Sequence, residues 1–326
     1  MSEDGPTTSL DVRVPAALDG QRVDRALSML IGLSRRSAAE VVASGAVTVD
    51  GRPVRSRSTT LHEGQRLEAA VAQVPADRPR ADPSVGFTVV YADDDIVVVD
   101  KPAGLVVHHG AGHGGGTLVD GLLARFADLG VLAESGVGDP RRPGIVHRLD
   151  KGTSGLMVVA RSPAAFEVLS AQLRHHQAER RYLALVAGVV ASDRGQVDAP
   201  IDRSWRQPDR MTVSATGRPA RTDYLVRTRY ASPVPSTLLE ATLETGRTHQ
   251  VRVHMSAIGH PVVGDQRYGG ARALPRQLVD RLGNDRLFLH AWRLTLKHPD
   301  GRVLAWESSL PADLEDTLSL LEPQQA

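Results

Sequence analysis

The stretch GIVHRLDKGTSGLMVVAR, residues 144–161, places a group of ionisable side chains directly before a run of apolar ones. The ionisable residues are His147, Arg148, Asp150 and Lys151, and a glycine-containing turn separates them from the sequence Leu-Met-Val-Val-Ala. The apolar run predicts a buried strand. Functional sites are usually built on loops that a rigid element holds in place. An isolated aspartate in such a loop more often caps nearby backbone amides, so the rest of the chain must decide between a site and a solvated turn.

Segments with strand patterns outnumber segments with helix patterns on either side of this stretch. Short β-rich runs are joined by turn sequences such as Asp300-Gly301, and such pairs predict hairpins. The predicted strands are 87–91, 96–100, 155–161, 182–190, 238–243, 289–297 and 303–307, and the predicted helices are 117–126, one that starts at Ser162-Pro163, and 248–259 with Thr248 as its cap. Because hairpins replace βαβ alternation, we expect an α+β fold on a largely antiparallel, mixed sheet.

The first 73 residues form a separate pattern. Apolar residues at 23, 26, 27, 30 and 31 predict an amphipathic helix, and Ser37 is placed to cap a second helix at 38–43. Asp50-Gly51 predicts a turn between two short strands, and residues 1–9 are expected to be disordered. A following segment rich in proline, aspartate and arginine predicts a linker. The expected organisation is a small α+β domain at 10–74, a linker at 75–84 and a larger domain at 85–326.

Composition places the chain among ordinary globular proteins, with 41% hydrophobic and 24% charged residues. Its longest apolar runs, such as 96–99, are far shorter than the roughly 20 residues that a membrane-spanning helix needs. The polar start of the chain argues against a signal peptide. Cysteine is absent, which excludes disulfides and thiolate catalysis and fits a reducing compartment. We therefore expect a cytoplasmic protein, a monomer, without membrane contact.

The basic residues are dominated by arginine. The formal net charge is only +1, yet 36 of the 39 basic residues are arginines, because Lys101, Lys151 and Lys297 are the three lysines. GC-rich codon usage accounts for most of this bias. Arginine also suits phosphate and base edges better than lysine does, so the places where arginines cluster are more informative than their number.

Five further blocks accompany the central stretch in a fixed order. They are IVVVDKPAGLVVH at 96–108, RYLALVAG at 181–188, LETGRTHQVRVH at 243–254, GDQRYG at 264–269 and LHA at 289–291. Together with HRLDKGTSG they resemble the RluA-type family of RNA pseudouridine synthases, over about residues 85–310. The resemblance implies an enzyme that isomerises uridine to pseudouridine. It also implies that a catalytic cleft splits the sheet, with Asp150 at the centre of the cleft.

The resemblance assigns chemical roles to three residues. Asp150 matches the family's catalytic aspartate, and Tyr182 matches a tyrosine that would form a wall against uracil and act as general base. Arg252 is the predicted cation beside Asp150, with Arg247 as the alternative. A tyrosine of ordinary pKa, about 10, is a poor base at neutral pH, so the role of Tyr182 requires a perturbed environment or a water relay.

Two other residues of the central stretch are predicted to contact RNA. An enzyme that acts on a base must take it out of its stack, and Arg148 would occupy the vacated space, although a salt bridge within the loop is an equal alternative. His147 would support the loop or contact phosphate. The reaction involves neither redox change nor hydrolysis, so we expect no cofactor and no metal. The carboxylate of Asp150 would attack C1′ of the ribose or remove the C2′ proton, and the sequence does not choose between these routes.

The N-terminal pattern, RVDRALSML followed by LSRRSAAEVVASGAVTVDGRPVR, resembles an S4 RNA-binding domain. Its candidate phosphate contacts are Arg22, Arg25, Arg35 and Arg36. An S4 domain before such a synthase domain implies structured RNA as the partner, with large-subunit ribosomal RNA as the expected target and transfer RNA as the alternative.

Three other functions were weighed against the sequence. A metalloenzyme would need clustered ligands, but no HExxH occurs and His249 and His254 are spaced to point apart. A glycoside hydrolase usually needs two opposed carboxylates, whereas the matched blocks place arginine and tyrosine with Asp150. A non-catalytic RNA-binding module would be favoured if Asp150 were replaced, and it is present.

Overall fold

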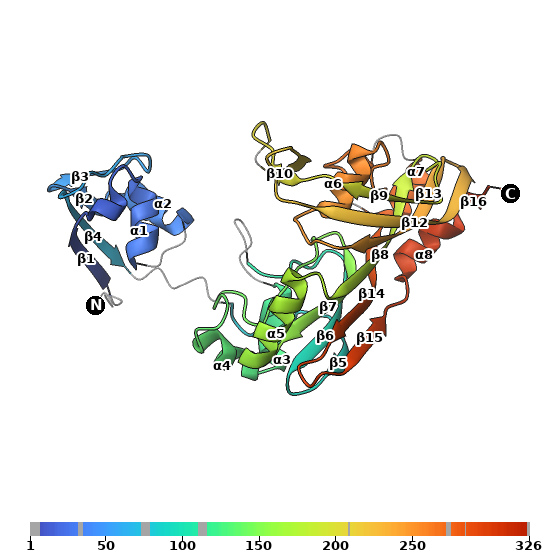
Figure 1. The fold of residues 1–326 in the computed structure, drawn as a ribbon, viewed down its shortest axis with the longest axis horizontal. Coiled ribbons are helices and arrows are strands. Elements are labelled where there is room, and N and C mark those ends of the chain that lie inside the picture. Colours follow the sequence, from blue (N-terminus) through green and yellow to red (C-terminus); the bar gives the residue numbers. More distant parts are fainter. Residues whose placement is uncertain are drawn as a thin grey trace. The chain divides into compact units, whose positions relative to one another are not determined.

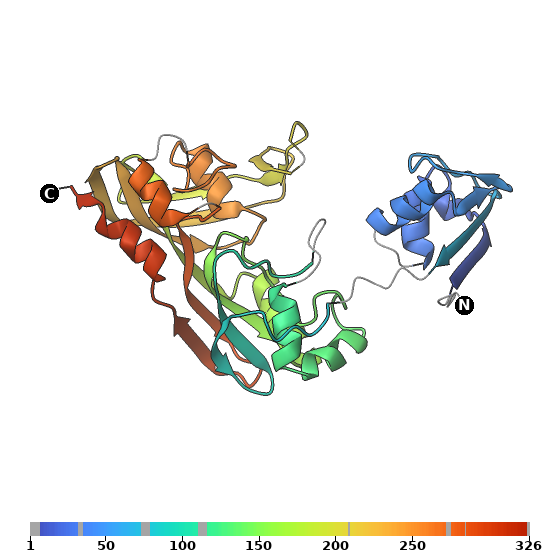
Figure 2. The same ribbon diagram turned by 180° about the vertical axis from the view of Figure 1, so that it is seen from behind.

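The computed structural model describes residues 7–31, 35–72, 79–109, 116–207, 209–271, 275–283 and 285–324. The chain divides into two compact units, Met1–Arg78 and Pro79–Ala326, and each has a buried core of its own (Figures 1 and 2). None of the helices in the described ranges has the length and apolar character required to cross a bilayer.

The first unit packs two helices on one small sheet. Its elements are β1 (Thr7–Arg13), the 3-10 helix η1 (Ala16–Leu18), α1 (Val23–Ile31), α2 (Arg35–Ser44), β2 (Val47–Val49), β3 (Arg52–Pro53) and β4 (Arg66–Ala72). The strands are antiparallel in the order β1-β4-β2-β3. Leu27 of α1, Val42 of α2 and Leu67 of β4 are fully buried together, so the predicted amphipathic helix does cover the sheet.

Three details of this unit bear on the sequence predictions. Asp50 and Gly51 have φ angles of 51° and 74°, the left-handed pair that a tight hairpin needs, so the predicted turn is confirmed. Residues 7–9 belong to strand β1, paired with β4, so the expectation that 1–9 are disordered was wrong for these three. Helix α2 begins at Arg35, which places Ser37 inside the helix rather than at its cap.

The second unit is built on a ten-stranded sheet. Eight of these strands follow the order β16-β12-β13-β8-β14-β7-β6-β5, and the other two, β15 and β9, pair with β14 and β12. The strands are β5 (Thr88–Ala92), β6 (Ile96–Lys101), β7 (Ser154–Ala160), β8 (Glu179–Ala187), β9 (Arg194–Asp198), β12 (Arg221–Ser232), β13 (Ser236–Leu243), β14 (Leu289–Lys297), β15 (Val303–Glu307) and β16 (Glu322–Pro323). A separate two-stranded sheet joins β10 (Ile201–Arg203) to β11 (Met211–Val213). The pairings are antiparallel except between β7 and β14, which confirms the expected α+β fold on a largely antiparallel, mixed sheet.

The parallel contact between β7 and β14 joins two parts of the sheet and is only two residues long. His290 and Ala291 of β14 pair with Ser154 and Gly155 of β7, and β14 then continues beside β15. Gly155 has a φ of 113°, and a Cβ there would lie 2.3 Å from the carbonyl oxygen of Ala291. Only glycine permits this approach. The loop that carries Asp150 ends here, directly before β7.

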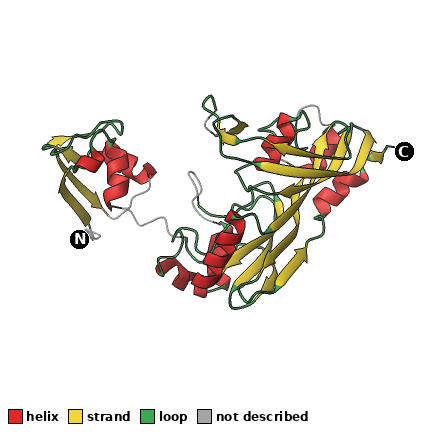
Figure 3. Cartoon of the chain, viewed as in Figure 1, coloured by secondary structure: helices red, strands yellow, loops and turns green. Residues whose placement is uncertain are grey.

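Helices cover both faces of the sheet (Figures 1 and 3). They are α3 (Leu118–Arg125), α4 (Asp128–Glu134), α5 (Pro163–Arg174), α6 (Gln250–Ala257), α7 (Arg276–Leu282) and α8 (Ala312–Ser319). Along β6, Val97 and Val99 pack with the core of α3 and α4, whereas Ile96 and Val98 pack with α5. This two-sided burial explains why the strand is a continuous apolar run rather than an alternating one.

Candidate active site

Buried polar groups hold the loop of Asp150 in place. Lys101 is fully buried, and its Nζ donates to the carbonyl oxygens of Pro102 and Leu105, both at 2.9 Å. Arg286 donates from Nη1 to the carbonyl oxygen of Gly152 at 2.9 Å and from Nη2 to Ser154 Oγ at 2.9 Å. Burial lowers the pKa of Lys101 to about 7, although nearby Asp150 opposes the shift. The loop is therefore fixed on both sides before any substrate binds.

The carboxylate of Asp150 is paired with Arg252. Arg252 Nη1 donates to Asp150 Oδ2 at 2.9 Å, while its Nε and Nη2 donate to the two oxygens of Asp265 at 2.7 and 3.0 Å. Asp265 is fully buried and also accepts the backbone amide of Tyr268 at 3.0 Å. A bidentate contact of this kind fixes a guanidinium in both position and plane. Asp265 thus orients Arg252 toward Asp150.

Helix α6 brings Arg252 to this position. Its N-cap is His249, in the left-handed region with a φ of 58°, so the predicted cap at Thr248 was wrong by one residue. Gln250 Oε1 accepts from Thr245 Oγ at 2.6 Å and from the amide of Arg247 at 3.0 Å. The buried side chain of Gln250 thus connects the preceding turn to the first turn of the helix. With the helix held in this way, Arg252 faces inward rather than to solvent.

The electrostatics of the pair keep Asp150 ionised. Burial by itself raises the pKa of Asp150, but His249, Arg252 and Arg148 lower it, and the net pKa lies below the usual value. Burial also lowers the pKa of His249, to about 4, so this ring is neutral at pH 7. The arginines therefore stabilise the carboxylate at neutral pH.

His249 lies on the other side of the carboxylate. Its Nε2 is 3.8 Å from Asp150 Oδ1, and its Nδ1 is 2.8 Å from the hydroxyl of Tyr268. That hydroxyl also accepts the amide of Met211 at 2.9 Å, so Tyr268 links His249 to strand β11. The Tyr268 ring also lies 5.0 Å from the Arg252 guanidinium.

Asp150 lies between two pockets. One, of about 560 Å³, is lined by Asp150 and Arg252 together with Tyr182, Arg180 and Leu289. The other, of about 610 Å³, shares Asp150 and Arg252 and is lined further by Lys151, Arg210 and Arg267. Both pockets are rich in cations, and the first also has Tyr182, Leu243 and Leu289 in its wall.

Tyr182 and Arg180 reach the first pocket from strand β8. Tyr182, Ala184 and Val186 belong to one core and Leu185 to another, so the side chains of this strand alternate between its two faces. Burial raises the pKa of Tyr182, and the charge of Asp150 adds to this while Arg180 opposes it. Its hydroxyl is therefore protonated at neutral pH. Arg180 is buried, and its Nε makes no hydrogen bond with the residues that the structure describes.

The remaining predicted residues of this unit, His147, Arg148 and Arg247, all line the first pocket. Arg148 is exposed and lines both pockets. His147 accepts the amide of Val158 on β7 at Nε2, at 3.0 Å, and burial keeps its pKa well below the usual value. Arg247 donates from Nε to the carbonyl oxygen of Pro219 at 2.9 Å. Of the two candidate partners of Asp150, Arg252 makes the contact and Arg247 does not.

Sequence reasoning did not assign a role to Asp265, Tyr268 or His249. The first two stand in the GDQRYG block, whose match with the family was noted without a function. Asp150 already supplies an anion for Arg252, so the pairing of Arg252 with a second carboxylate, Asp265, did not follow from the sequence. His249 was considered as a possible metal ligand. Within the described ranges, no group of three or more histidine, aspartate or glutamate residues is arranged to hold a metal ion.

Matches to known proteins identify this arrangement. A model of RNA pseudouridylate synthases matches residues 95–257, and an S4 domain model matches residues 21–67. The chain belongs to the RNA pseudouridylate synthase family. It is 42% identical over 310 residues to an uncharacterized RNA pseudouridine synthase of Mycobacterium bovis, with 94% of this chain and 96% of the relative covered.

Other relatives of this synthase carry more specific names. It is 41% identical to ribosomal large subunit pseudouridine synthase D of Xanthomonas campestris pv. campestris, over 96% of this chain and 92% of the relative. The solved structure of human RNA pseudouridylate synthase domain containing 1 superposes with a TM-score of 0.57 at 26% identity, over 74% of this chain and 89% of that one. The synthase is therefore an isomerase that converts uridine in RNA to pseudouridine.

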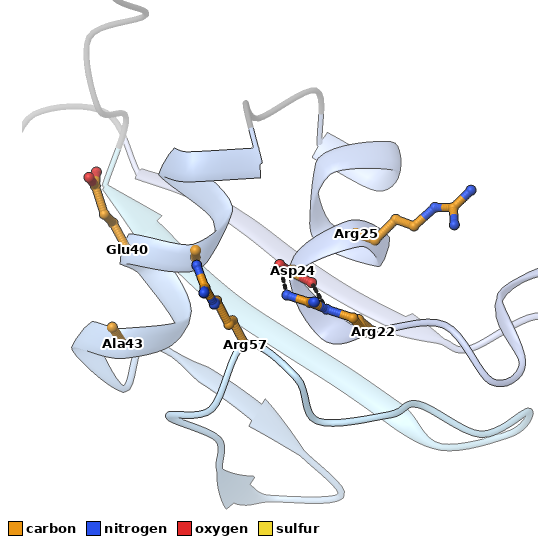
Figure 4. Close-up of a pocket in the computed structure, with 7 residues that line it drawn as sticks. Arg22, Asp24, Arg25, Glu40, Ala43 and Arg57 are labelled. Atoms are coloured by element: carbon orange, nitrogen blue, oxygen red, sulfur yellow. Dashed lines mark hydrogen bonds and ion pairs between the residues drawn. The ribbon is translucent and has the colours of Figure 1, made fainter. Parts of the chain in front are cut away.

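The S4 unit has a basic hollow of its own, shown in Figure 4. It measures about 790 Å³ and is lined by Arg22, Arg25 and Arg57 together with Asp24 and Glu40. Arg22 is held by Asp24 at 2.6 and 3.0 Å, whereas Arg25 points away from this pair (Figure 4). Arg57 was not among the predicted residues. The side chains of Arg35 and Arg36, which were, lie outside the described part of the chain.

Proposed function

We propose that this synthase modifies uridine in large-subunit ribosomal RNA, with Asp150 as its catalytic carboxylate. The 2.9 Å contact between Arg252 Nη1 and Asp150 Oδ2 carries the proposal. It occupies one oxygen and leaves Oδ1 with no hydrogen bond to the described residues, and His249 Nε2 lies 3.8 Å from Oδ1. Oδ1 is the atom that meets the ribose.

The reaction needs a carboxylate and a cation that keeps it ionised. The bond between N1 and C1′ breaks, uracil turns, and C5 bonds to C1′, after which C5 loses a proton and N1 gains one. Asp150 Oδ1 either bonds to C1′ during the exchange or takes the C2′ proton and returns it. Both routes require an ionised carboxylate, and the lowered pKa of Asp150 supplies it at neutral pH.

The 560 Å³ pocket is the proposed site of the uracil ring. Tyr182 and Leu289 offer it apolar surface, and an aromatic ring stacks well on a base. Because the pKa of Tyr182 is raised and its hydroxyl stays protonated, Tyr182 accepts the C5 proton while it passes its own proton through water to N1. Arg148, exposed at the entrance to both pockets, replaces the extracted nucleotide in the RNA.

Two observations support ribosomal RNA over transfer RNA as the target. Relatives about 40% identical over nearly the whole chain are named ribosomal large subunit pseudouridine synthase D, and the chain carries an S4 domain. A chain without cysteine fits the cytoplasm, where ribosomes are assembled.

Deleting the gene should remove one or a few pseudouridines from large-subunit ribosomal RNA. The positions should return when the wild-type chain is expressed and stay absent when the Asp150→Asn variant is expressed. Mapping pseudouridines in total RNA of the three strains measures this. If the lost positions lie in transfer RNA, the proposed target is wrong although the activity is right.

Deleting residues 1–78 should weaken binding to structured RNA at least about tenfold, because the arginines around the S4 hollow are lost. The catalytic unit keeps its own core, so its cooperative unfolding should persist in circular dichroism. Filter binding across a salt series measures the effect: affinity of the full chain should fall steeply as salt rises, and the truncated chain should show a smaller slope. Equal slopes for the two proteins would count against an RNA-binding role for this unit.

A further inference from the structure

Trp205 is the most exposed of the large hydrophobic side chains in the described ranges, with 83% of its surface open to solvent. It lies in the connection between β10 and β11, a hairpin that projects from the edge of the catalytic unit (Figures 1 and 2). Scattered exposed apolar residues are ordinary in soluble proteins. An indole is the largest side chain, however, and at this position it contributes little to the core of the fold.

The surroundings of Trp205 are basic. The guanidinium of Arg206 stacks over its ring, 4.8 Å from the ring centroid, and Arg203 and Arg210 stand on the two sides of the connection. Of the nearby acids, Asp202 accepts the amide of Arg203 at 2.7 Å. An aromatic ring among guanidinium groups is the combination that binds an unpaired base together with its phosphates.

The hairpin is joined to the active site by hydrogen bonds. Met211 of β11 donates its amide to the hydroxyl of Tyr268 at 2.9 Å, and that hydroxyl contacts His249 beside Asp150. Arg210 itself lines the 610 Å³ pocket with Asp150. Trp205 is five residues from Arg210, so an extended chain separates their Cα atoms by at most about 17 Å. The Cα of Trp205 therefore lies within about 17 Å of a residue that lines the pocket of Asp150.

We propose that Trp205, with Arg206 stacked on it, is a platform for an unpaired base of the RNA substrate close to the target nucleotide. This deepens the proposed function, on which it rests, by adding a contact outside the uracil pocket. The platform binds the flanking nucleotide by stacking, which every base permits, and so it strengthens binding without selecting a sequence. The continuity of the hairpin with the catalytic pocket and its positive charge favour RNA over a protein as the occupant.

Fluorescence of Trp205 tests the proposal directly. The full chain with Trp292→Phe and Trp306→Phe retains Trp205 as its one tryptophan, and neither replaced residue lines a pocket described above. Titration with single-stranded oligouridylate, labelled so that anisotropy reports binding independently, should quench the Trp205 emission in step with binding. Binding of the oligonucleotide without quenching, or no binding at all, would overturn the platform.

Substitutions supply the second readout. Trp205→Ala should raise the Kd for oligouridylate and the KM for substrate RNA roughly 5- to 150-fold, with kcat changed less than about twofold. Trp205→Phe should recover most of the loss because a ring remains. The matched control is Val303→Ala, at an apolar side chain on β15 that is 71% exposed. Unchanged Kd and KM in Trp205→Ala would also overturn the proposal. A wild-type chain that fails to modify a large-subunit ribosomal RNA transcript would instead refute the proposed target, because the quenching is measured on oligouridylate.

Discussion

Replacing Asp150 with asparagine should lower kcat for pseudouridine formation by at least about 10³-fold. Asparagine has neither the charge nor the basicity that attack on C1′ or removal of the C2′ proton requires, and general-base groups alone contribute about 10²- to 10⁴-fold. The measurement is single-turnover conversion of a large-subunit ribosomal RNA transcript. Single turnover isolates the chemical step from product release.

The same variant should keep its fold and its RNA affinity. Arg252 remains bonded to both oxygens of Asp265, so no charge is left unpaired, and the amide oxygen at position 150 still accepts from Nη1. Unfolding free energy should change by less than about 1 kcal/mol, and Kd by less than about threefold. Turnover close to that of the wild type would remove Asp150 from the mechanism, whereas a loss of affinity equal to the loss of rate would assign it to binding.

The elements with a strong local signal were predicted well. Ser162 does cap α5, its hydroxyl accepting the amide of Ala165 at 3.1 Å with Pro163 in the first turn, and β15 matches its predicted range. The long strand β12, Arg221–Ser232, was missed. Its arginines and threonines do not alternate with apolar residues, and its register shifts at a bulge between Val226 and Thr228, so burial on one face leaves no simple period in the sequence.

The contacts of Arg252 with Asp150 and Asp265 could be predicted in part only. Asp150 and Arg252 are 102 residues apart, and their pairing was inferred from family resemblance, not from any local pattern. Asp265 reaches Arg252 because a tight turn follows Val262, which pairs with Val186 of β8. In this turn a Cβ at Gly270 would lie 1.6 Å from the carbonyl oxygen of Val262. Close backbone approaches of this kind depend on tertiary packing, which spacing along the chain does not encode.

The structure also separates roles that one sequence block had merged. Within LETGRTHQVRVH, Gln250 ties the turn to the helix, Arg252 faces Asp150, and His254 is buried, with its ring nitrogens 2.9 Å from Thr222 Oγ and from the carbonyl oxygen of Ala199. Residues of one helix thus serve the fold and the chemistry on different faces. A motif match identifies the block as a whole, and only the geometry tells its supporting residues from those that meet the carboxylate.

Substitution of Arg252 should affect both the rate and the pH dependence. In the wild type, kcat/KM should fall with decreasing pH only below about pH 5, because the pKa of Asp150 is lowered and the carboxylate stays ionised above it. Arg252→Lys keeps a positive charge but not the three-way contact with Asp150 and Asp265. The pKa of Asp150 should therefore rise, the acid limb should move to higher pH, and kcat at pH 7 should fall roughly 10²-fold.

Arg252→Met provides the contrast that distinguishes charge from position. It leaves Asp265, which is fully buried, without its cation, and the loss of one partner of a buried pair costs about 3–5 kcal/mol. The variant should unfold at a lower denaturant concentration than Arg252→Lys, and adding Asp265→Asn to it should restore part of the stability but none of the rate. A pH–rate profile of Arg252→Lys that superposes on that of the wild type would mean that Arg252 orders the fold and does not set the ionisation of Asp150.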